Sequence, residues 1–424
     1  ICFRAQLTIL TDSERLSGAA EECETAAVRL AELGDHAGVA KARQMRANAL
    51  ARLGRIGDCE AELDLALTAA RKAEDRRRVS AVLGAAPPAA LWGPSPVPRA
   101  GGRCLDVVRL LRITAGSPAV EAVSLRCQGV LEALRGRFHA ARDLLAASRA
   151  TAEELGLRQG LLETELYAGI VELMADQPGS AEPHLRAAHA GLGTMGIGAD
   201  AGQAAAYLGR ALLLQGQIDE AESLAGEAIA TAGQNFQTSV AAHSVHAEIL
   251  SSRGQHGEAV AEAKAAVTTA AGADIVIDHA IASAALARVL ETAGDAAGAA
   301  AAQNEAARLY EAKGALPVGS DNSAMTGRVE DPGAEPVDDI AVNPQILLHR
   351  RLMEASAGRD VKQLSSVIAP DMRRCDRRPL VSAGDVDREG FLAGVTALYA
   401  TGGGHRLDER VLAMRGTRLL LTHV

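Results

Sequence analysis

Three short motifs bring together residue types that could do chemistry. Gly191, Gly193 and Gly196 have the G-x-G-x-x-G spacing that binds the pyrophosphate of a dinucleotide. His243 and His246 lie three residues apart, so on a helix they share a face and could ligate a metal ion. Asp274 and Asp278 enclose an Ile-Val-Ile run, as paired carboxylates on a metal-binding strand could.

The elements around the glycine motif do not suit a cofactor site. A dinucleotide site needs a strand before the glycines, whereas the preceding residues 181–190, AEPHLRAAHA, are typical of a helix. We therefore interpret 191–196 as a turn between helices. The sequence holds no G-x-x-x-x-G-K-[ST], G-x-S-x-G or H-E-x-x-H pattern, so we expect no cofactor in this chain.

The candidate metal ligands also have simpler interpretations. A zinc site needs a third ligand beside His243 and His246, and the sequence indicates none, so we interpret them as a solvated or core pair. Asp274 falls where a helix should begin, and we predict that it caps that helix with Asp278 one turn later. The six cysteines include no C-x-x-C pair and are predicted to be reduced, mostly buried thiols of a cytoplasmic protein.

Charge excludes two classes of partner. The formal net charge is −9, which disfavours sequence-independent binding to nucleic acid and binding to an anionic membrane surface. Basic runs at 71–78 and 373–378 are interpreted as solvated faces. No apolar stretch is long enough to predict a transmembrane helix. We expect a protein partner, with no direct contact to nucleic acid or membrane.

The elements that would position these residues repeat. A turn with a small residue at its centre recurs about every 40 residues, marked by Gly136, Asp176, Gly216, Gly254 and Gly294. Gly54 lies two periods before Gly136, with the turn between them unmatched. A fixed period of this length predicts a solenoid of antiparallel helix pairs over residues 1–315.

One segment breaks the repeat. Residues 87–102 contain five prolines, so we predict an extended Pro-rich insertion there. The segment holds Trp92, the only tryptophan, which either fills a gap in the repeats or presents an aromatic anchor to a partner. Arg99 is grouped with it as a speculative partner residue.

The chain changes character after the repeats. Residues 316–341 are polar and acidic without periodicity, which predicts a linker. Residues 342–424 read as helix, helix, strand, helix and a hairpin that turns at Arg415 and Gly416, which is an α+β pattern. The chain begins at Ile1 and ends within the last expected strand, so we expect it to be part of a longer protein.

The repeats resemble tetratricopeptide repeats in their paired helices and turns, although their period is near 40 residues instead of 34. LWGPSPVPRAGGRCLDVVRLLRI at 91–113 and VLEALRGRFHAARDLL at 130–145 resemble the C-terminal repeat region of large actinobacterial signalling proteins. Those proteins carry a class III adenylate/guanylate cyclase domain and an AAA-type ATPase domain before the repeats. The cyclase and ATPase motifs have no counterpart here, so no catalytic residue is carried over.

Residues 342–424 resemble the start of a SnoaL-like domain, of the nuclear transport factor 2-like fold. The resemblance rests on the expected helix pair up to Pro370, DMRRCDRRPL at 371–380 and ERVLAMRGTRLLLTHV at 409–424. That resemblance implies a cone of curved sheet around a pocket, truncated here because the closing strands are missing. Asp376, Tyr399 and His405 are the polar candidates for that pocket.

The sequence thus predicts a mainly α protein: a tetratricopeptide-like solenoid followed by a small, truncated α+β domain. Resemblance implies a protein-interaction and sensor segment that regulates an upstream ATPase and cyclase in an ATP-binding signal-transduction protein. The alternatives are the repeat region of a large LuxR-type transcriptional regulator, a stand-alone repeat scaffold, or a small enzyme or binder formed by the complete SnoaL-like domain.

Overall fold

The structure is a computed structural model that describes residues 1–114, 117–317, 361–368, 370, 372–374, 386–400, 410–415 and 419–423. It divides into two compact units, Ile1–Ser320 and Asp321–Val424, here called unit 1 and unit 2. Each unit is described by itself.

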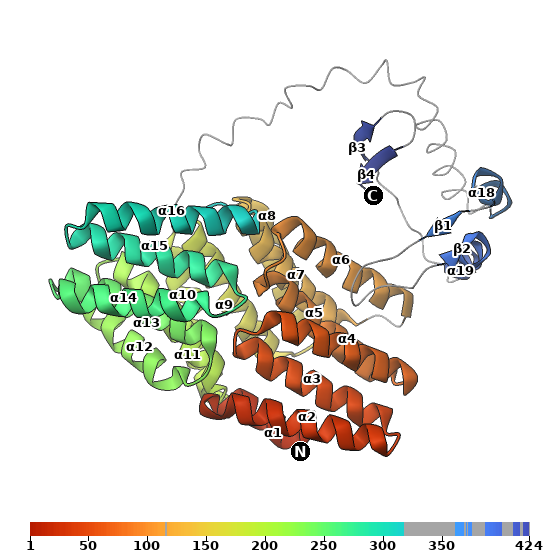
Figure 1. Cartoon of the computed structure of the whole chain (residues 1–424), viewed down its shortest axis with the longest axis horizontal. Coiled ribbons are helices and arrows are strands. Elements are labelled where there is room, and N and C mark those ends of the chain that lie inside the picture. Colours follow the sequence, from red (N-terminus) through yellow and green to blue (C-terminus); the bar gives the residue numbers. More distant parts are fainter. Residues whose placement is uncertain are drawn as a thin grey trace. The chain divides into compact units, whose positions relative to one another are not determined.

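The described part of unit 1 is built from helices, which lie side by side in Figure 1. They are α1 (Cys2–Thr11), the 3₁₀ helix η1 (Ser13–Arg15), α2 (Leu16–Glu32), α3 (His36–Arg52), α4 (Ile56–Lys72), α5 (Arg76–Trp92), α6 (Val97–Thr114), α7 (Pro118–Ala133), α8 (Phe138–Glu154), α9 (Arg158–Met174), α10 (Pro178–Thr194), α11 (Gly198–Leu214), α12 (Ile218–Ala232), α13 (Phe236–Ser252), α14 (His256–Ala271), α15 (Val276–Thr292) and α16 (Ala296–Lys313).

The helix lengths explain the sequence period. A typical helix here has 17 residues, as α9 and α10 do, and the turn between those two, 175–177, has three. One helix and one turn therefore take 17 + 3 = 20 residues, and a pair takes 40. The predicted turns are confirmed, because every marker residue has a positive φ, between 55° and 84°: Gly54, Gly136, Asp176, Gly216, Gly254 and Gly294.

The predicted extended insertion at 87–102 is wrong. Helix α5 continues through Pro87 and Pro88 to Trp92, and α6 begins at Val97, so only residues 93–96 connect them. Proline already has a helical φ, and its cost in a helix is the lost N–H donor and a clash with the preceding turn. Burial of Pro87 and of the Ala-Ala-Leu-Trp run that follows offsets that cost. The unmatched turn of the repeat series is therefore the one at Gly93.

The helices form an inner and an outer layer. Helix α12 buries one face, through Ala221, Leu224, Ala225, Ala228 and Ala232. Its neighbour α11 buries residues on all sides, and α9, α13 and α15 do the same. Odd-numbered helices from α3 onwards thus form the inner layer and even-numbered helices the outer layer, as a solenoid requires.

Unit 1 contacts itself again after about 220 residues. Ser13 Oγ donates to the carbonyl oxygen of Thr231 at 2.7 Å, across 218 positions. Gly57 N donates to Asp274 Oδ2 at 2.9 Å, across 217 positions. Lys313 Nζ donates to the carbonyl oxygen of Leu91 at 2.7 Å, across 222 positions. This near-constant offset means that the solenoid closes one superhelical turn, and we call this line of contacts the seam.

The predicted capping role of Asp274 is therefore wrong. The residue preceding α15 is Ile275, which offers no side-chain cap, while the carboxylate of Asp274 serves the first turn of α4. Its backbone N–H also donates to the carbonyl oxygen of Gly54 at 3.1 Å. Asp274 therefore caps α4 across the seam, and not α15, the helix that follows it in the sequence.

Unit 2 is described in parts. Its elements are α18 (Val361–Val367), β1 (Arg373–Arg374), β2 (Val386–Asp387), α19 (Arg388–Ala400), β3 (Arg410–Arg415) and β4 (Leu419–His423). β1 pairs antiparallel with β2, and β3 pairs antiparallel with β4 with a register shift between Val411 and Ala413. The predicted helix REGFLAGVTALYA at 388–400 and the final hairpin are confirmed. The hairpin turn at Gly416, the first helix expected in this part of the chain (343–358) and most of the linker lie outside the described residues.

Candidate binding chamber

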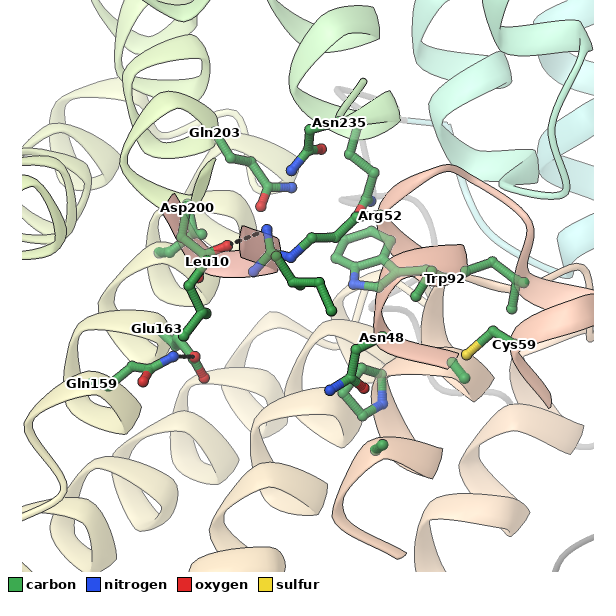
Figure 2. A pocket seen from close by; sticks show the side chains of 18 of the residues that line it. Leu10, Asn48, Arg52, Cys59, Trp92, Gln159, Glu163, Asp200, Gln203 and Asn235 are labelled. Atoms are coloured by element: carbon green, nitrogen blue, oxygen red, sulfur yellow. Dashed lines mark hydrogen bonds and ion pairs between the residues drawn. The ribbon is translucent and has the colours of Figure 1, made fainter. Parts of the chain in front are cut away.

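A cavity of about 390 Å³ lies along the inner layer, and we call it the chamber. Figure 2 shows side chains converging on it from helices that are far apart in sequence. Helices α1, α3, α4, α5, α7, α9 and α11 contribute, together with the start of α13. Its polar lining residues are Gln6, Asn48, Arg52, Arg126, Gln159, Glu163, Tyr167, Asp200, Gln203, Asn235 and Gln237.

An ion pair links two walls of the chamber. Arg52 Nη1 lies 2.8 Å from Asp200 Oδ1, and the two side chains are 20 % and 13 % exposed. Figure 2 marks this contact between α3 and α11 with a dashed line. Burial lowers the pKa of Arg52 while Asp200 raises it, and the ion pair outweighs burial, so the pKa of Arg52 is raised. Arg52 therefore stays charged and paired with Asp200.

A chain of contacts forms a second wall. Trp92 Nε1 donates to Tyr167 Oη at 3.2 Å, and the two rings meet edge to face with centroids 6.0 Å apart. The Arg126 guanidinium lies 5.1 Å from the centroid of the Tyr167 ring, and its Nη2 donates to Glu163 Oε2 at 2.5 Å. Burial raises the pKa of Tyr167, so its hydroxyl stays protonated and can donate. This wall is neutral overall and held in place from both ends.

Six carboxamides line the chamber between these walls: Gln6, Asn48, Gln159, Gln203, Asn235 and Gln237. Some are engaged, since Gln159 Nε2 donates to Glu163 Oε1 at 2.8 Å and Asn235 Oδ1 accepts from Thr238 N at 3.2 Å. Gln237 Nε2 is buried without a partner among the described residues. A carboxamide both donates and accepts, so the lining can satisfy a ligand that presents both kinds of group.

The predicted site residues divide clearly. Trp92 is 7 % exposed and lines the chamber, so it belongs to the interior and is not presented on the outer surface. Arg99 is exposed on α6 and is absent from the lining. Asp376 and His405 lie outside the described residues, and Tyr399 lies in α19 with its side chain outside them.

The structure places the glycine motif and the histidine pair as follows. Residues 191–194 end α10, and Gly196 has φ +72° in the turn before α11, so this motif is an inter-helix turn. His243 and His246 each place Nδ1 2.9 Å from Glu262 Oε1. Among the described residues, no group of three or more His, Cys, Asp or Glu side chains is arranged to hold a metal ion.

The described cysteines are free thiols: Cys2 is half-buried, and Cys23, Cys59, Cys104 and Cys127 are buried. Cys375 lies outside the described residues. In the described ranges, none of the helices has the length and apolar character that a membrane span requires.

Sequence reasoning missed most of the chamber. The sequence alone does not mark Arg52, Asp200, Arg126 or Asn48 as site residues, since they are ordinary polar residues within helical patterns. One signal was present: Glu163 and Gln203 both line the chamber and lie one period apart, 203 − 163 = 40. Polar residues that recur at one register of α9 and α11 therefore indicate that both helices face the chamber.

Comparison with known proteins gives likenesses at the level of helical repeats. No protein-family model matches the chain, and no curated protein matches it. A tetratricopeptide repeat protein from Parabacteroides merdae is 13 % identical with a TM-score of 0.35, and the match covers 72 % of this chain and 96 % of that one.

Two further solved structures match to a similar degree. A Rap protein complexed with competence and sporulation factor is 14 % identical with a TM-score of 0.38, covering 73 % of this chain and 80 % of that one. The apo form of the quorum sensor NprR from B. thuringiensis is 11 % identical with a TM-score of 0.38, covering 84 % of this chain and 91 % of that one.

Proposed function

We propose that unit 1 is a protein-interaction module whose chamber binds an extended peptide segment of a partner. The observation that carries this proposal is the convergence of six carboxamides on one cavity inside the superhelix. Each residue of a peptide offers an N–H donor and a carbonyl acceptor, and carboxamides complement both. Apolar lining residues such as Leu10 and Met45 can contact the side chains between those groups.

The charges of the chamber support the same choice. Arg52 is paired with Asp200 and Arg126 with Glu163, so the lining offers no excess charge to a strongly charged ligand. A chain with a net charge of −9 also disfavours nucleic acid as the partner. A peptide with hydrogen-bonding groups and moderate apolar character fits this lining.

Resemblance extends the proposal to the parent protein. The repeats would sense the partner and bias an upstream ATPase and class III adenylate/guanylate cyclase in a cytoplasmic, actinobacterial signalling protein, and unit 2 would be the start of a SnoaL-like domain. The free thiols of the described part favour a reducing compartment. No cofactor is part of the proposal. The alternative parent is a LuxR-type regulator.

Peptide selection tests the binding role. A random peptide library displayed on phage would be selected against the full chain, and selected peptides would be measured by fluorescence polarisation. Asn48→Ala removes a half-buried carboxamide of the chamber, and Asn304→Ala removes an exposed one on α16 as the matched control. We expect affinity to fall about tenfold for Asn48→Ala alone. Equal affinities for both variants would refute the chamber as the binding site.

The sequence of the surrounding gene tests which domains the longer protein carries. The gene should be sequenced upstream of Ile1 and downstream of Val424. A P-loop and a cyclase domain upstream would support the regulatory role, and ATPase and cyclase rates of the parent should then change with Asn48→Ala. A helix-turn-helix module downstream would favour the LuxR-type alternative, and the absence of both would leave a stand-alone scaffold.

A further inference from the structure

A second cavity, of about 260 Å³, lies further along the inner layer, and we call it the apolar cavity. Helices α9, α11, α13, α15 and α16 supply its walls. The apolar and aromatic side chains that line it include Ile170, Leu173, Tyr207, Val245 and Ile281. Trp92 lines this cavity as well as the chamber, so this residue borders both.

One edge of this lining is charged. Arg288 donates through Nη2 to Glu248 Oε1 at 2.7 Å and through Nε to Glu248 Oε2 at 3.1 Å. Arg210 donates to the same carboxylate through Nη1. Two guanidinium groups therefore share one carboxylate, and this triad carries one excess positive charge. Asp176, which is exposed, is the remaining charged residue of the lining.

Arg210 keeps part of its hydrogen-bonding capacity unused. Within the residues that the structure describes, its Nε and Nη2 have no hydrogen-bond acceptor. These two nitrogens form the side-on edge of the guanidinium, whose parallel N–H groups match the two oxygens of a carboxylate. The Arg210 side chain is 20 % exposed, and a charge-assisted hydrogen bond from a guanidinium to an anion is stronger than one to a neutral acceptor.

We propose that the apolar cavity binds a small apolar carboxylic acid. The aliphatic or aromatic body lies among Ile170, Val245 and Ile281, and the carboxylate takes the Nε and Nη2 edge of Arg210. A water molecule takes about 30 Å³ of liquid, so a cavity of this size holds on the order of ten non-hydrogen atoms. This small-molecule site is distinct from the peptide role of the chamber and does not depend on it.

Trp92 provides the measurement, because it is the only tryptophan of the chain and lines the cavity. The full chain would be titrated with octanoate and with 3-phenylpropanoate, and in parallel with the neutral alcohols octan-1-ol and 3-phenylpropan-1-ol. We expect a saturable change in Trp92 emission with at least one acid, and at least tenfold weaker binding of its alcohol.

Three variants separate the parts of the site. Arg210→Lys keeps the positive charge but loses the bidentate Nε and Nη2 edge, whereas Arg210→Met loses the charge and the edge. The acid should therefore bind more weakly to Arg210→Lys than to the parent chain, and most weakly to Arg210→Met. In both Arg210 variants Glu248 keeps its two hydrogen bonds from Arg288, which supports folding. Ala284→Phe fills the cavity from α15 and should abolish binding of acid and alcohol alike. Arg186→Met, on exposed α10 surface, is the matched control and should bind like the parent chain.

Failure of both acids to alter Trp92 emission in the folded chain would overturn the proposal. Equal affinity for acid and alcohol would overturn the role of Arg210, and unchanged binding by Ala284→Phe would overturn the location. The circular-dichroism spectrum of each variant distinguishes lost binding from lost folding. Peptide binding in the chamber is measured separately, with Asn48→Ala. The proposal for the apolar cavity and the proposal for the chamber can therefore be refuted independently of each other.

Discussion

The carboxylate of Asp274 accepts a hydrogen bond from the backbone N–H of Gly57 at 2.9 Å, although 217 positions separate the two residues. Gly57 lies in the first turn of α4, where backbone N–H groups have no acceptor within the helix. The residue preceding α4, Arg55, provides no side-chain cap. Asp274 therefore caps a helix of the preceding superhelical turn, and the cap joins the two turns at the seam.

Replacing Asp274 with Ala should loosen the seam. Loss of a capping side chain typically costs about 1 kcal/mol. We expect this loss in urea unfolding, together with faster hydrogen exchange of the Gly57 N–H. Asp35→Ala is the matched control, because Asp35 caps its own helix at Gly38 N with a 2.8 Å bond. It should cost a similar amount and leave exchange at Gly57 unchanged; protection at Gly57 that survives Asp274→Ala would contradict the role of the seam.

Replacing Gly216 with Val should destabilise unit 1 through the backbone alone. Gly216 has φ +76°, and a Cβ there would meet no atom within 4 Å, so no clash contributes. A β-branched residue in this conformation costs about 1–2 kcal/mol. Asp176→Gly is the reverse test at the equivalent turn, where a non-glycine residue has φ +55°, and should be no less stable than the parent chain. A circular-dichroism melt of Gly216→Val without any loss of stability would refute the turn assignment.

The features that could be predicted from sequence are those with local causes. A turn that leaves a helix through positive φ favours glycine wherever it occurs, so Gly136, Gly216 and Gly254 give the period without reference to the rest of the chain. The helix at Pro87 could not be predicted this way. The local rule disfavours it, and burial of Pro87 and Trp92 against other helices overrides that rule.

The seam and the chamber depend on the rotation between successive helix pairs, which no local sequence pattern shows. The small rotation from each helix pair to the next accumulates along the solenoid and decides which repeats meet. Arg52 and Asp200 are partners because of this accumulated rotation, as are Gly57 and Asp274. The sequence shows the period, and the structure is needed for the rotation.

Asp278 should make stability depend on pH. Burial raises the pKa of its carboxyl from 3.8 to about 7, with the charge of Lys313 opposing that shift, and Tyr207 is the other titratable neighbour. The folded state then binds a proton that the unfolded state releases, so this contribution is full below pH 3.8 and is lost as pH rises through about 7.

Asp278→Asn should remove that dependence. The free energy of unfolding of the parent chain should fall, relative to the variant, by about 1.4 kcal/mol per pH unit between pH 4 and pH 7. Urea unfolding of both proteins at pH 5, 6 and 7 measures the difference, which cancels the titration of other groups. Parallel curves would show that Asp278 ionises normally in the folded state. Measurements stay below pH 8, because burial lowers the pKa of Lys313 to about 8.

The ion pair between Arg52 and Asp200 should contribute more than an exposed pair does. Removing one partner of a buried pair leaves the other charged and unpaired, which costs about 3–5 kcal/mol. Arg52 and Asp200 are 20 % and 13 % exposed, so Arg52→Met should approach the lower end of that range in urea unfolding. Arg55→Met breaks a pair whose members are 59 % and 55 % exposed, and should cost less than about 1 kcal/mol.

A double-mutant cycle isolates the interaction across the chamber. Asp200→Asn alone leaves the guanidinium of Arg52 unpaired, whereas the double variant leaves neither charge behind, so it should be more stable than the sum of the single losses predicts. We expect a coupling energy above about 1 kcal/mol, measured by urea unfolding of the parent, both single variants and the double variant. A coupling energy near zero would mean that α3 and α11 do not hold each other through this pair, and the chamber would then need another source of rigidity.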